Sequence, residues 1–274
     1  MWSSAFTSAK VMVQYSPPIF ILAIRFLISG SIGVMLAFLV GQRINFSKNE
    51  WKVICIFGIC QNAIYLGLNF LAMKWIDAGI GAVIASTLPI LVVGISVCLG
   101  KIKLTAVGTL GLFIGFLGVN LIMVQRVTEP SSIVGLFFCI IGAISLAAAT
   151  IVVNETAKKQ ENILMIVGLQ MLVGSATLFP FAIIIENWFL NPTIPFLISF
   201  SYTTIFPGLV ATVIWLKLVG RIGANQASSY HFLNPFFGVL TAAILLRESL
   251  NIYDFFGVLI ITAGIVITQK YANQ

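Results

Sequence analysis

Residues 73–104, MKWIDAGIGAVIASTLPILVVGISVCLGKIKL, align without a gap with residues 219–250, VGRIGANQASSYHFLNPFFGVLTAAILLRESL. The alignment pairs Pro89 with Pro235, and continued at the same separation it pairs Gly111 with Gly257 and Gly118 with Gly264. Identical leucines and isoleucines are common by chance in apolar sequence, whereas a matched proline or glycine fixes a feature of the backbone. The matched pairs therefore indicate an internal duplication.

The composition is that of a membrane protein. Hydrophobic residues make up 59% and charged residues 8% of the 274 residues, whereas roughly a quarter of the residues of a soluble domain are charged. One apolar run follows another along the chain, and many are long enough to cross the roughly 30 Å of bilayer hydrocarbon as helices. The runs do not alternate as the strands of a transmembrane barrel do. We therefore expect an all-α polytopic membrane protein.

Nine apolar runs are long enough to be complete spans. They cover residues 19–41, 53–74, 79–100, 104–125, 133–154, 162–186, 195–217, 224–246 and 252–270. Residues 1–14 are helical in pattern but short, so we interpret them as a truncated first helix and expect about ten helices in all. Two copies then hold five spans each, the first over residues 1–127 and the second over residues 128–274. Because five is odd, the second copy enters the membrane from the opposite side, and such inverted repeats are typical of secondary transporters.

The basic residues give the orientation. Most of the 15 lysines and arginines fall on one side if the first span starts in the cytoplasm. They are Arg43, Lys48, Lys52, Lys101, Lys103, Lys158, Lys159, Lys217, Arg221 and Lys270. Short cytoplasmic loops carry an excess of lysine and arginine, so we predict a multi-pass protein of the inner (plasma) membrane with both termini in the cytoplasm. The net charge of +7 lies in these loops and predicts no nucleic-acid partner.

The sequence predicts no metal site and no cofactor. Cys55, Cys60, Cys98 and Cys139 lie in apolar runs without the spacing of metal ligands, which favours buried free thiols. No motif of the GxxxxGKS kind occurs, so transport driven by ATP on this chain is not expected.

Several motifs occur in a recognisable order. They are WSSAFTSAK (2–10), YSPPIFILAIRFLISG (15–30), AMKWIDAGIGAVIASTLPILV (72–92) and ASSYHFLNPFFGVLTAAILLRESL (227–250), the last with Glu248 in its closing turn. Their order resembles the drug/metabolite transporter superfamily, EamA type. The resemblance implies a ten-helix bundle with a central cavity lined by the third, fourth, sixth, eighth and ninth helices, and transport of small metabolites such as amino acids. The sequence departs from the family at His231, where an aliphatic residue is usual, and before residue 2, where further apolar residues are usual.

Polar side chains within the spans are the candidates for contact with a solute, because in hydrocarbon they must face the bundle interior or a wet cavity. Asn62, Tyr65 and Asn69 share one helical face, and Tyr230 and Asn234 share another. The predicted substrate-binding set is Asn62, Tyr65, Asn69, Ser86, Gln170, Trp215, Tyr230, His231 and Asn234. The alternative for each polar side chain is a hydrogen bond between helices.

Four further residues have more than one interpretation. His231, the one histidine, could bind a solute or couple transport to protons, or it could be satisfied by a neighbouring helix; no acidic residue within the membrane stands near it in sequence as a relay. Pro89 and Pro235 are either hinges or structural kinks. Arg25 either snorkels to the outer surface, with hydrogen bonds to loop carbonyls, or attracts anionic solutes at the cavity mouth.

These observations predict a secondary transporter that moves a small metabolite by alternating access. Aromatic cavity residues favour an amino acid or an amino-acid derivative; nucleosides, S-adenosylmethionine or drugs are the alternatives. A lipid flippase or a non-transporting scaffold is the alternative of another class. An intramembrane protease using Ser228 or Ser229 with His231 is not expected, because no GxSG-like turn holds a serine and the sequence has no second histidine. The expected partners are the solute and the lipid bilayer, with the chain a monomer or a homodimer.

Overall fold

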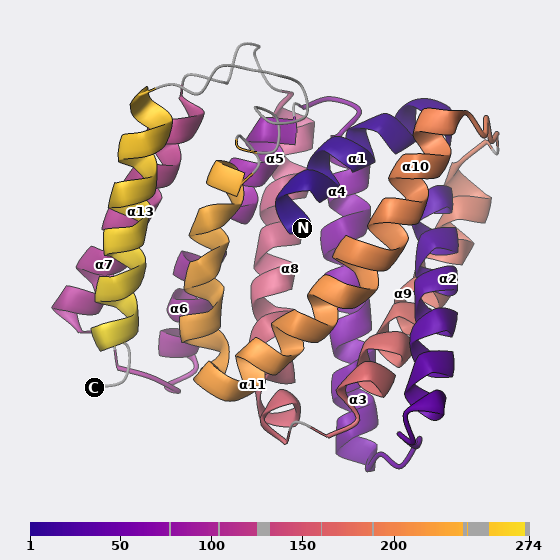
Figure 1. Cartoon of the computed structure of the whole chain (residues 1–274), viewed down its shortest axis with the longest axis horizontal. Helices are drawn as coiled ribbons and strands as arrows, with labels where there is room; N and C mark the ends of the chain where they lie inside the picture. Colours follow the sequence, from indigo (N-terminus) through magenta and orange to yellow (C-terminus); the bar gives the residue numbers. More distant parts are fainter. Residues whose placement is uncertain are drawn as a thin grey trace.

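The computed structural model is a bundle of helices (Figure 1). It describes residues 1–76, 78–103, 105–124, 132–159, 161–187, 189–237, 240 and 252–271, and it contains no strand within these ranges. Six of the described helical segments are long and apolar enough to cross a membrane, and Ala106–Ile122 and Ile252–Thr268 are shorter apolar helices. The prediction of an all-α polytopic membrane protein is confirmed.

The helices follow one another with short connections. In chain order they are α1 (Trp2–Tyr15), α2 (Pro18–Leu39), α3 (Lys48–Phe57), η1 (Gly58–Leu66), α4 (Gly67–Ala72), α5 (Ala78–Ala85), α6 (Leu88–Cys98), α7 (Ala106–Met123), α8 (Ile133–Lys158), α9 (Ile163–Ile185), α10 (Ile194–Thr203), η2 (Thr204–Val210), α11 (Ala211–Ser229), η3 (Tyr230–Leu233) and α13 (Ile252–Tyr271). The wide π turns of η1 and η2 lie inside continuous helices, and η3 is a 3₁₀ turn. A sharp bend at Gly223, where φ is 82°, divides α11.

The helix boundaries repeat along the chain at the separation seen in the sequence. The residue pairs that begin equivalent elements are Lys48 and Ile194 for α3 and α10, and Gly58 and Thr204 for η1 and η2. Even the π turn recurs at the same place, although Gly58 and Thr204 differ in side chain. The predicted boundary between residues 127 and 128 lies outside the described residues, as do Arg126, Arg247 and Glu248, and it stays a prediction.

Equivalent helices of the two copies pack against each other in opposite directions. On α2 and α9, a Cβ added to Gly30 would lie 2.9 Å from the carbonyl oxygen of Gly168, and Ser175 donates a hydrogen bond to the carbonyl of Ala23. On α7 and α13, Gly115 faces Gly264 in the same way. Residue numbers rise along one helix of each pair and fall along its partner, as an inverted repeat requires. Small residues allow this close approach.

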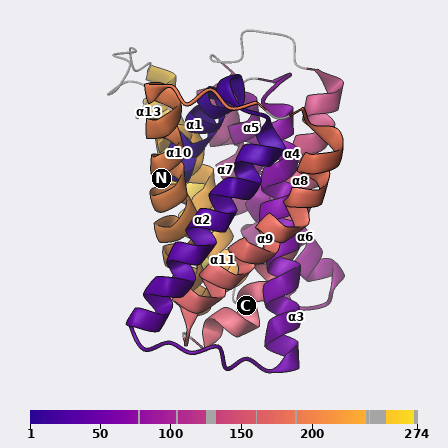
Figure 2. The same cartoon turned by 90° about the vertical axis from the view of Figure 1, so that its right-hand side faces the viewer.

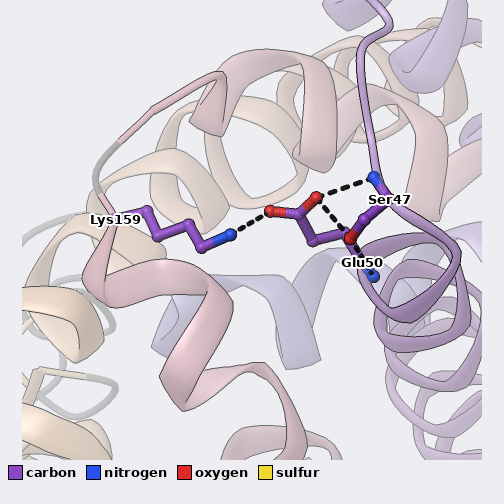
Figure 3. A network of polar contacts seen from close by, with 3 residues as sticks. All are labelled: Ser47, Glu50 and Lys159. Atoms are coloured by element: carbon purple, nitrogen blue, oxygen red, sulfur yellow. Dashed lines mark hydrogen bonds and ion pairs between the residues drawn. The ribbon is translucent and has the colours of Figure 1, made fainter.

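One end of the bundle gathers the connections that carry the basic residues. The connections after α2, α6 and α8 lie at that end with the bend of α11, and Figures 1 and 2 agree on this. Ser47 caps α3 there, and Glu50 accepts hydrogen bonds from both the main-chain N–H and the hydroxyl of Ser47 (Figure 3). The other oxygen of Glu50 pairs with Lys159 at the end of α8, and this hydrogen bond raises the pKa of Lys159.

Candidate functional site

The structure holds a cavity between the two copies. It comprises about 770 Å³ of space between its lining atoms, part of it open to the outside of the molecule. The first copy lines it with α1, α2, η1 and α4, and the second copy with α8, α9, η2, α11 and η3. A cavity at the interface of two inverted repeats is where secondary transporters bind their solutes.

The π turn η1 sets which residues of the third span reach the cavity. Residues 61, 65, 69 and 73 line it at strict four-residue spacing, together with residues 62, 66 and 70. In an α-helix of 3.6 residues per turn, each step of four residues rotates by about 40° off the face. The wider turn of η1 offsets part of this rotation and keeps Gln61 on the same face as Asn69 and Met73.

Asn62 and Asn69 are held by hydrogen bonds within the bundle. The Nδ2 of Asn62 donates to the main-chain carbonyl of Gln170, 3.0 Å away, and also to the Gln170 side chain. The Nδ2 of Asn69 donates to the carbonyl of Tyr65 at 2.8 Å, and its Oδ1 accepts from the thiol of Cys139. The Oδ1 of Asn62 has no hydrogen-bond partner.

His231 sits among aromatic rings at the cavity. Its ring centroid lies 4.9 Å from that of Trp215 and 5.3 Å from that of Trp2. The Nδ1 of His231 is 3.1 Å from the Nδ2 of Asn234. Because an amide nitrogen only donates, Nδ1 accepts and the proton of a neutral His231 sits on Nε2. That Nε2 is buried without a partner.

The structure separates the predicted site residues into two groups. Those that line the cavity are Asn62, Tyr65, Asn69, His231 and Asn234. Four others do not: Gln170 lies behind Asn62, Trp215 packs behind His231, Ser86 donates to the carbonyl of Ala82, and Tyr230 is 40% exposed. Binding roles for all nine stay predictions, and for the second group any role is indirect.

Gln61 and Arg25 line the cavity as well, and neither belongs to the substrate-binding set that the sequence predicts. Arg25 does not snorkel, since the side chain is only 4% exposed. Its guanidinium carbon lies 4.8 Å from the ring centroid of Phe26 and 5.7 Å from that of Phe70. The sequence signal for Gln61 was weak because it falls on the cavity face only with the π turn. For Arg25 the signal was its cost within an apolar span.

The two matched prolines each follow an interruption of a helix. α5 ends at Ala85, and α6 begins at Leu88 with Pro89 in its first turn. In the second copy the 3₁₀ turn η3 stands before Asn234 and Pro235. Discontinuous helices beside the binding site are a feature of transporters with inverted repeats. The hinge role of the two prolines stays a prediction.

Comparisons with known proteins agree with this architecture. A model of the EamA-like transporter family matches residues 1–124 and 133–269. The chain is 26% identical to the uncharacterized transporter YvbV of Bacillus subtilis, over 98% of this chain and 88% of that protein. It is 23% identical to the uncharacterized inner membrane transporter YedA of Escherichia coli, over 99% and 88%. A solved crystal structure has the same fold, with a TM-score of 0.80 and 17% identity, over 99% of this chain and 93% of the other.

Proposed function

Because the chain belongs to the EamA-like transporter family, we propose that it is a secondary transporter that moves a small metabolite by alternating access. The family supports a membrane transporter. We propose in addition the class of solute, the alternating-access mechanism and the orientation in the membrane.

One observation carries the proposal: four residues that line the cavity between the copies each have a buried polar atom without a hydrogen-bond partner. The residues concerned are Arg25, Gln61, Asn62 and His231. A buried polar group that lacks a hydrogen bond costs about 1–3 kcal/mol. Four residues with such atoms in one cavity lining favour a site whose polar groups a polar solute satisfies during transport.

The chemistry of these atoms favours an amino acid or an amino-acid derivative as the solute. Arg25 and His231 offer donors, whereas Gln61 and Asn62 offer acceptor oxygens. Trp2, Phe6 and Phe26 supply apolar surface around them. A compound with an acidic group, an amino group and an apolar side chain would satisfy all three kinds of lining.

The orientation is part of the proposal. The basic connections gathered at one end favour a cytoplasmic location for that end, so both termini would be cytoplasmic in the inner membrane. Single cysteines at Arg43 and at Asn191, which lies in the connection between α9 and α10, would test this with a membrane-impermeant thiol reagent in whole cells. Labelling at position 191 but not at position 43 supports the orientation, and the opposite pattern overturns it.

Counterflow in proteoliposomes tests the transport function. Proteoliposomes that contain the purified protein are loaded with one unlabelled solute at a time, and uptake of the same labelled solute is measured. The solutes are amino acids, nucleosides, S-adenosylmethionine and a lipophilic cation, and liposomes without protein are the blank. We expect counterflow of one or more amino acids. Movement of a fluorescent lipid without movement of any solute would instead indicate a flippase, and folded protein that moves nothing would contradict the proposal.

Asn62→Ala is the site variant for this assay, and Asn120→Ala is its matched control. Asn120 is exposed on α7 and bonds only to the carbonyl of Phe116 within its own helix. We expect counterflow to fall about tenfold in Asn62→Ala, the cost of one lost buried hydrogen bond, and to be unchanged in Asn120→Ala. An equal loss of counterflow in both variants would contradict a role of the cavity in transport.

A further inference from the structure

We propose that Arg25 is the anion-binding group of the cavity and that the solute carries a carboxylate that pairs with it. This inference rests on the proposed transport function and names the chemical class of solute that Arg25 recognises.

The first observation is that Arg25 is buried in the cavity lining without an anionic partner. The side chain is 4% exposed, and it forms no hydrogen bond or ion pair with any residue that the structure describes. Its Nε is buried and unpartnered. A guanidinium carries five N–H donors and keeps its charge in proteins. A buried charge without a counter-ion is costly, so a residue kept in this state indicates that a partner arrives from elsewhere.

Glu186 and Glu50 are engaged in contacts with groups other than Arg25. Glu186, at the end of α9, accepts hydrogen bonds from the main-chain N–H groups of Ile19 and Phe20. Glu50 pairs with Lys159, at the opposite end of the bundle from Glu186. Among the cavity-lining residues that the structure describes there is no Asp or Glu.

The aromatic neighbours of Arg25 leave its donors free for a ligand. Phe26 and Phe70 lie against the guanidinium at 4.8 Å and 5.7 Å. A ring face attracts the cation but does not accept hydrogen bonds along the guanidinium edge, where the N–H groups point. A carboxylate binds that edge through two parallel hydrogen bonds.

The rest of the lining favours a carboxylate over a phosphate or a sulfate. Arg25 is the one Lys or Arg among the described cavity-lining residues, so the lining matches a single negative charge. Gln61 and Asn62 line the same cavity, and the side-chain oxygen of each is buried without a partner. The Asn62 amide is oriented by its bond to the Gln170 carbonyl, so its oxygen is an acceptor for a donor such as an ammonium group. These features together fit an amino acid.

The test compares matched probes with and without the negative charge. Wild-type protein, Arg25→Gln and Arg25→Lys are reconstituted and assayed with phenylalanine, leucine, their methyl esters and phenethylamine. Arg43→Gln is the matched control, because it makes the same chemical change in an exposed connection outside the cavity. Size-exclusion profiles and thermal unfolding establish that each variant is folded.

We expect wild type and Arg43→Gln to bind and carry the free acids at least tenfold better than the esters or the amine. Arg25→Gln loses this preference, whereas Arg25→Lys keeps part of it because it keeps the charge. If Arg25→Gln does not fold, the test rests on the preference of Arg25→Lys for the free acids over the esters and the amine. If that preference remains tenfold while the affinity for both classes falls, the result contradicts the proposal.

The two proposals fail in different ways. Carriage of esters as well as acids by wild type, or an intact acid preference in Arg25→Gln, overturns the role of Arg25 while transport stands. The same holds if only nucleosides or cations are carried. If no solute is carried, the readout is thermal stabilisation of the protein by the ligands. Stabilisation by the free acids in wild type but not in Arg25→Gln supports the anion site although transport fails. If the free acids do not stabilise wild type, the anion site is overturned as well.

Discussion

The side-chain amide of Asn62 donates a hydrogen bond to the main-chain carbonyl of Gln170, 3.0 Å away. This bond joins η1 of the first copy to α9 of the second, at the back of the cavity. Gly58 stands one turn before it, so close to α9 that an added Cβ would meet the same carbonyl oxygen. The cavity face of η1 is therefore fixed by contacts with the other copy.

We predict that Gln170→Leu destabilises the protein. The substitution leaves the carbonyl bond in place but removes the side-chain acceptor of Asn62 and adds apolar volume beside it. The expected loss is about 1–3 kcal/mol, seen as a lower unfolding temperature in detergent. Gln14→Leu, at an exposed glutamine on α1, is the comparison, and an equal fall in both would argue against a special role for the contact between the copies.

A second prediction concerns the contact of α7 with α13. A Cβ on Gly264 would lie 2.4 Å from the backbone nitrogen of Gly115, so Gly264→Ala forces the two helices apart. We expect Gly264→Ala to destabilise the protein by about 1–3 kcal/mol or more, the usual cost of overpacking that shifts backbone.

Gly94→Ala is the control for this substitution. A Cβ at Gly94, within α6, would meet nothing within 4 Å. Alanine is the better helix former by roughly 0.5–1 kcal/mol, so the unfolding temperature of Gly94→Ala should hold or rise. A Gly264→Ala protein as stable as Gly94→Ala would show that α7 and α13 do not pack as described.

A third prediction concerns pH. The hydrogen bond to Glu50 raises the pKa of Lys159. A group whose pKa is higher in the folded state stabilises that state at pH values below its unfolded pKa, and loses this contribution as pH rises through the folded pKa. The stability advantage of wild type over Lys159→Met should therefore be constant near neutral pH and shrink above roughly pH 10.

Unfolding temperatures measured across that range check this prediction, with Lys103→Met as the control. Lys103 is exposed in the connection between α6 and α7. A difference between wild type and Lys159→Met that grows with rising pH would have the wrong sign for a lysine held by a carboxylate.

Much of the fold could be predicted because the residues that start, stop or interrupt its helices act locally. Matched prolines and glycines indicate the repeat. Because each copy is predicted to hold five spans, an odd number, the second copy is predicted to be inverted. The start of α3 at Lys48, five residues before the expected span at residue 53, also had a local signal: Ser47 and Glu50 form a capping box.

The candidate site was harder to predict because its determinants are contacts between distant segments. The sequence of η1, GICQNAIYL (58–66), contains no signal for a π turn. With regular α-helical spacing instead, Gln61 would lie off the cavity face. Tyr230 shares a periodic face with Asn234 only if the helix is regular, whereas η3 rotates Tyr230 outward and leaves Asn234 at the cavity. Burial of Arg25 follows from Phe70, 45 positions along the chain.

The last prediction concerns the two prolines as hinges. Pro89 lies in the first turn of α6, where proline is tolerated because that N–H has no partner within the helix. Pro89 is nevertheless buried, so Pro89→Ala loses packing contacts of the ring and should lower stability by about 1 kcal/mol. It also permits α5 and α6 to join into one continuous helix, and stiffening of this kind is expected to slow the exchange of conformations that transport requires.

We therefore expect Pro89→Ala to lower the maximal rate of counterflow severalfold with little change in solute affinity, and Pro89→Ala with Pro235→Ala to lower it further. Pro180→Ala, at a proline inside α9 that has no partner at the repeat separation, is the control. Because a structural kink would affect unfolding rather than the rate, loss of stability at unchanged rate would assign both prolines to structure. A lower rate in Pro180→Ala alone would move the hinge to α9.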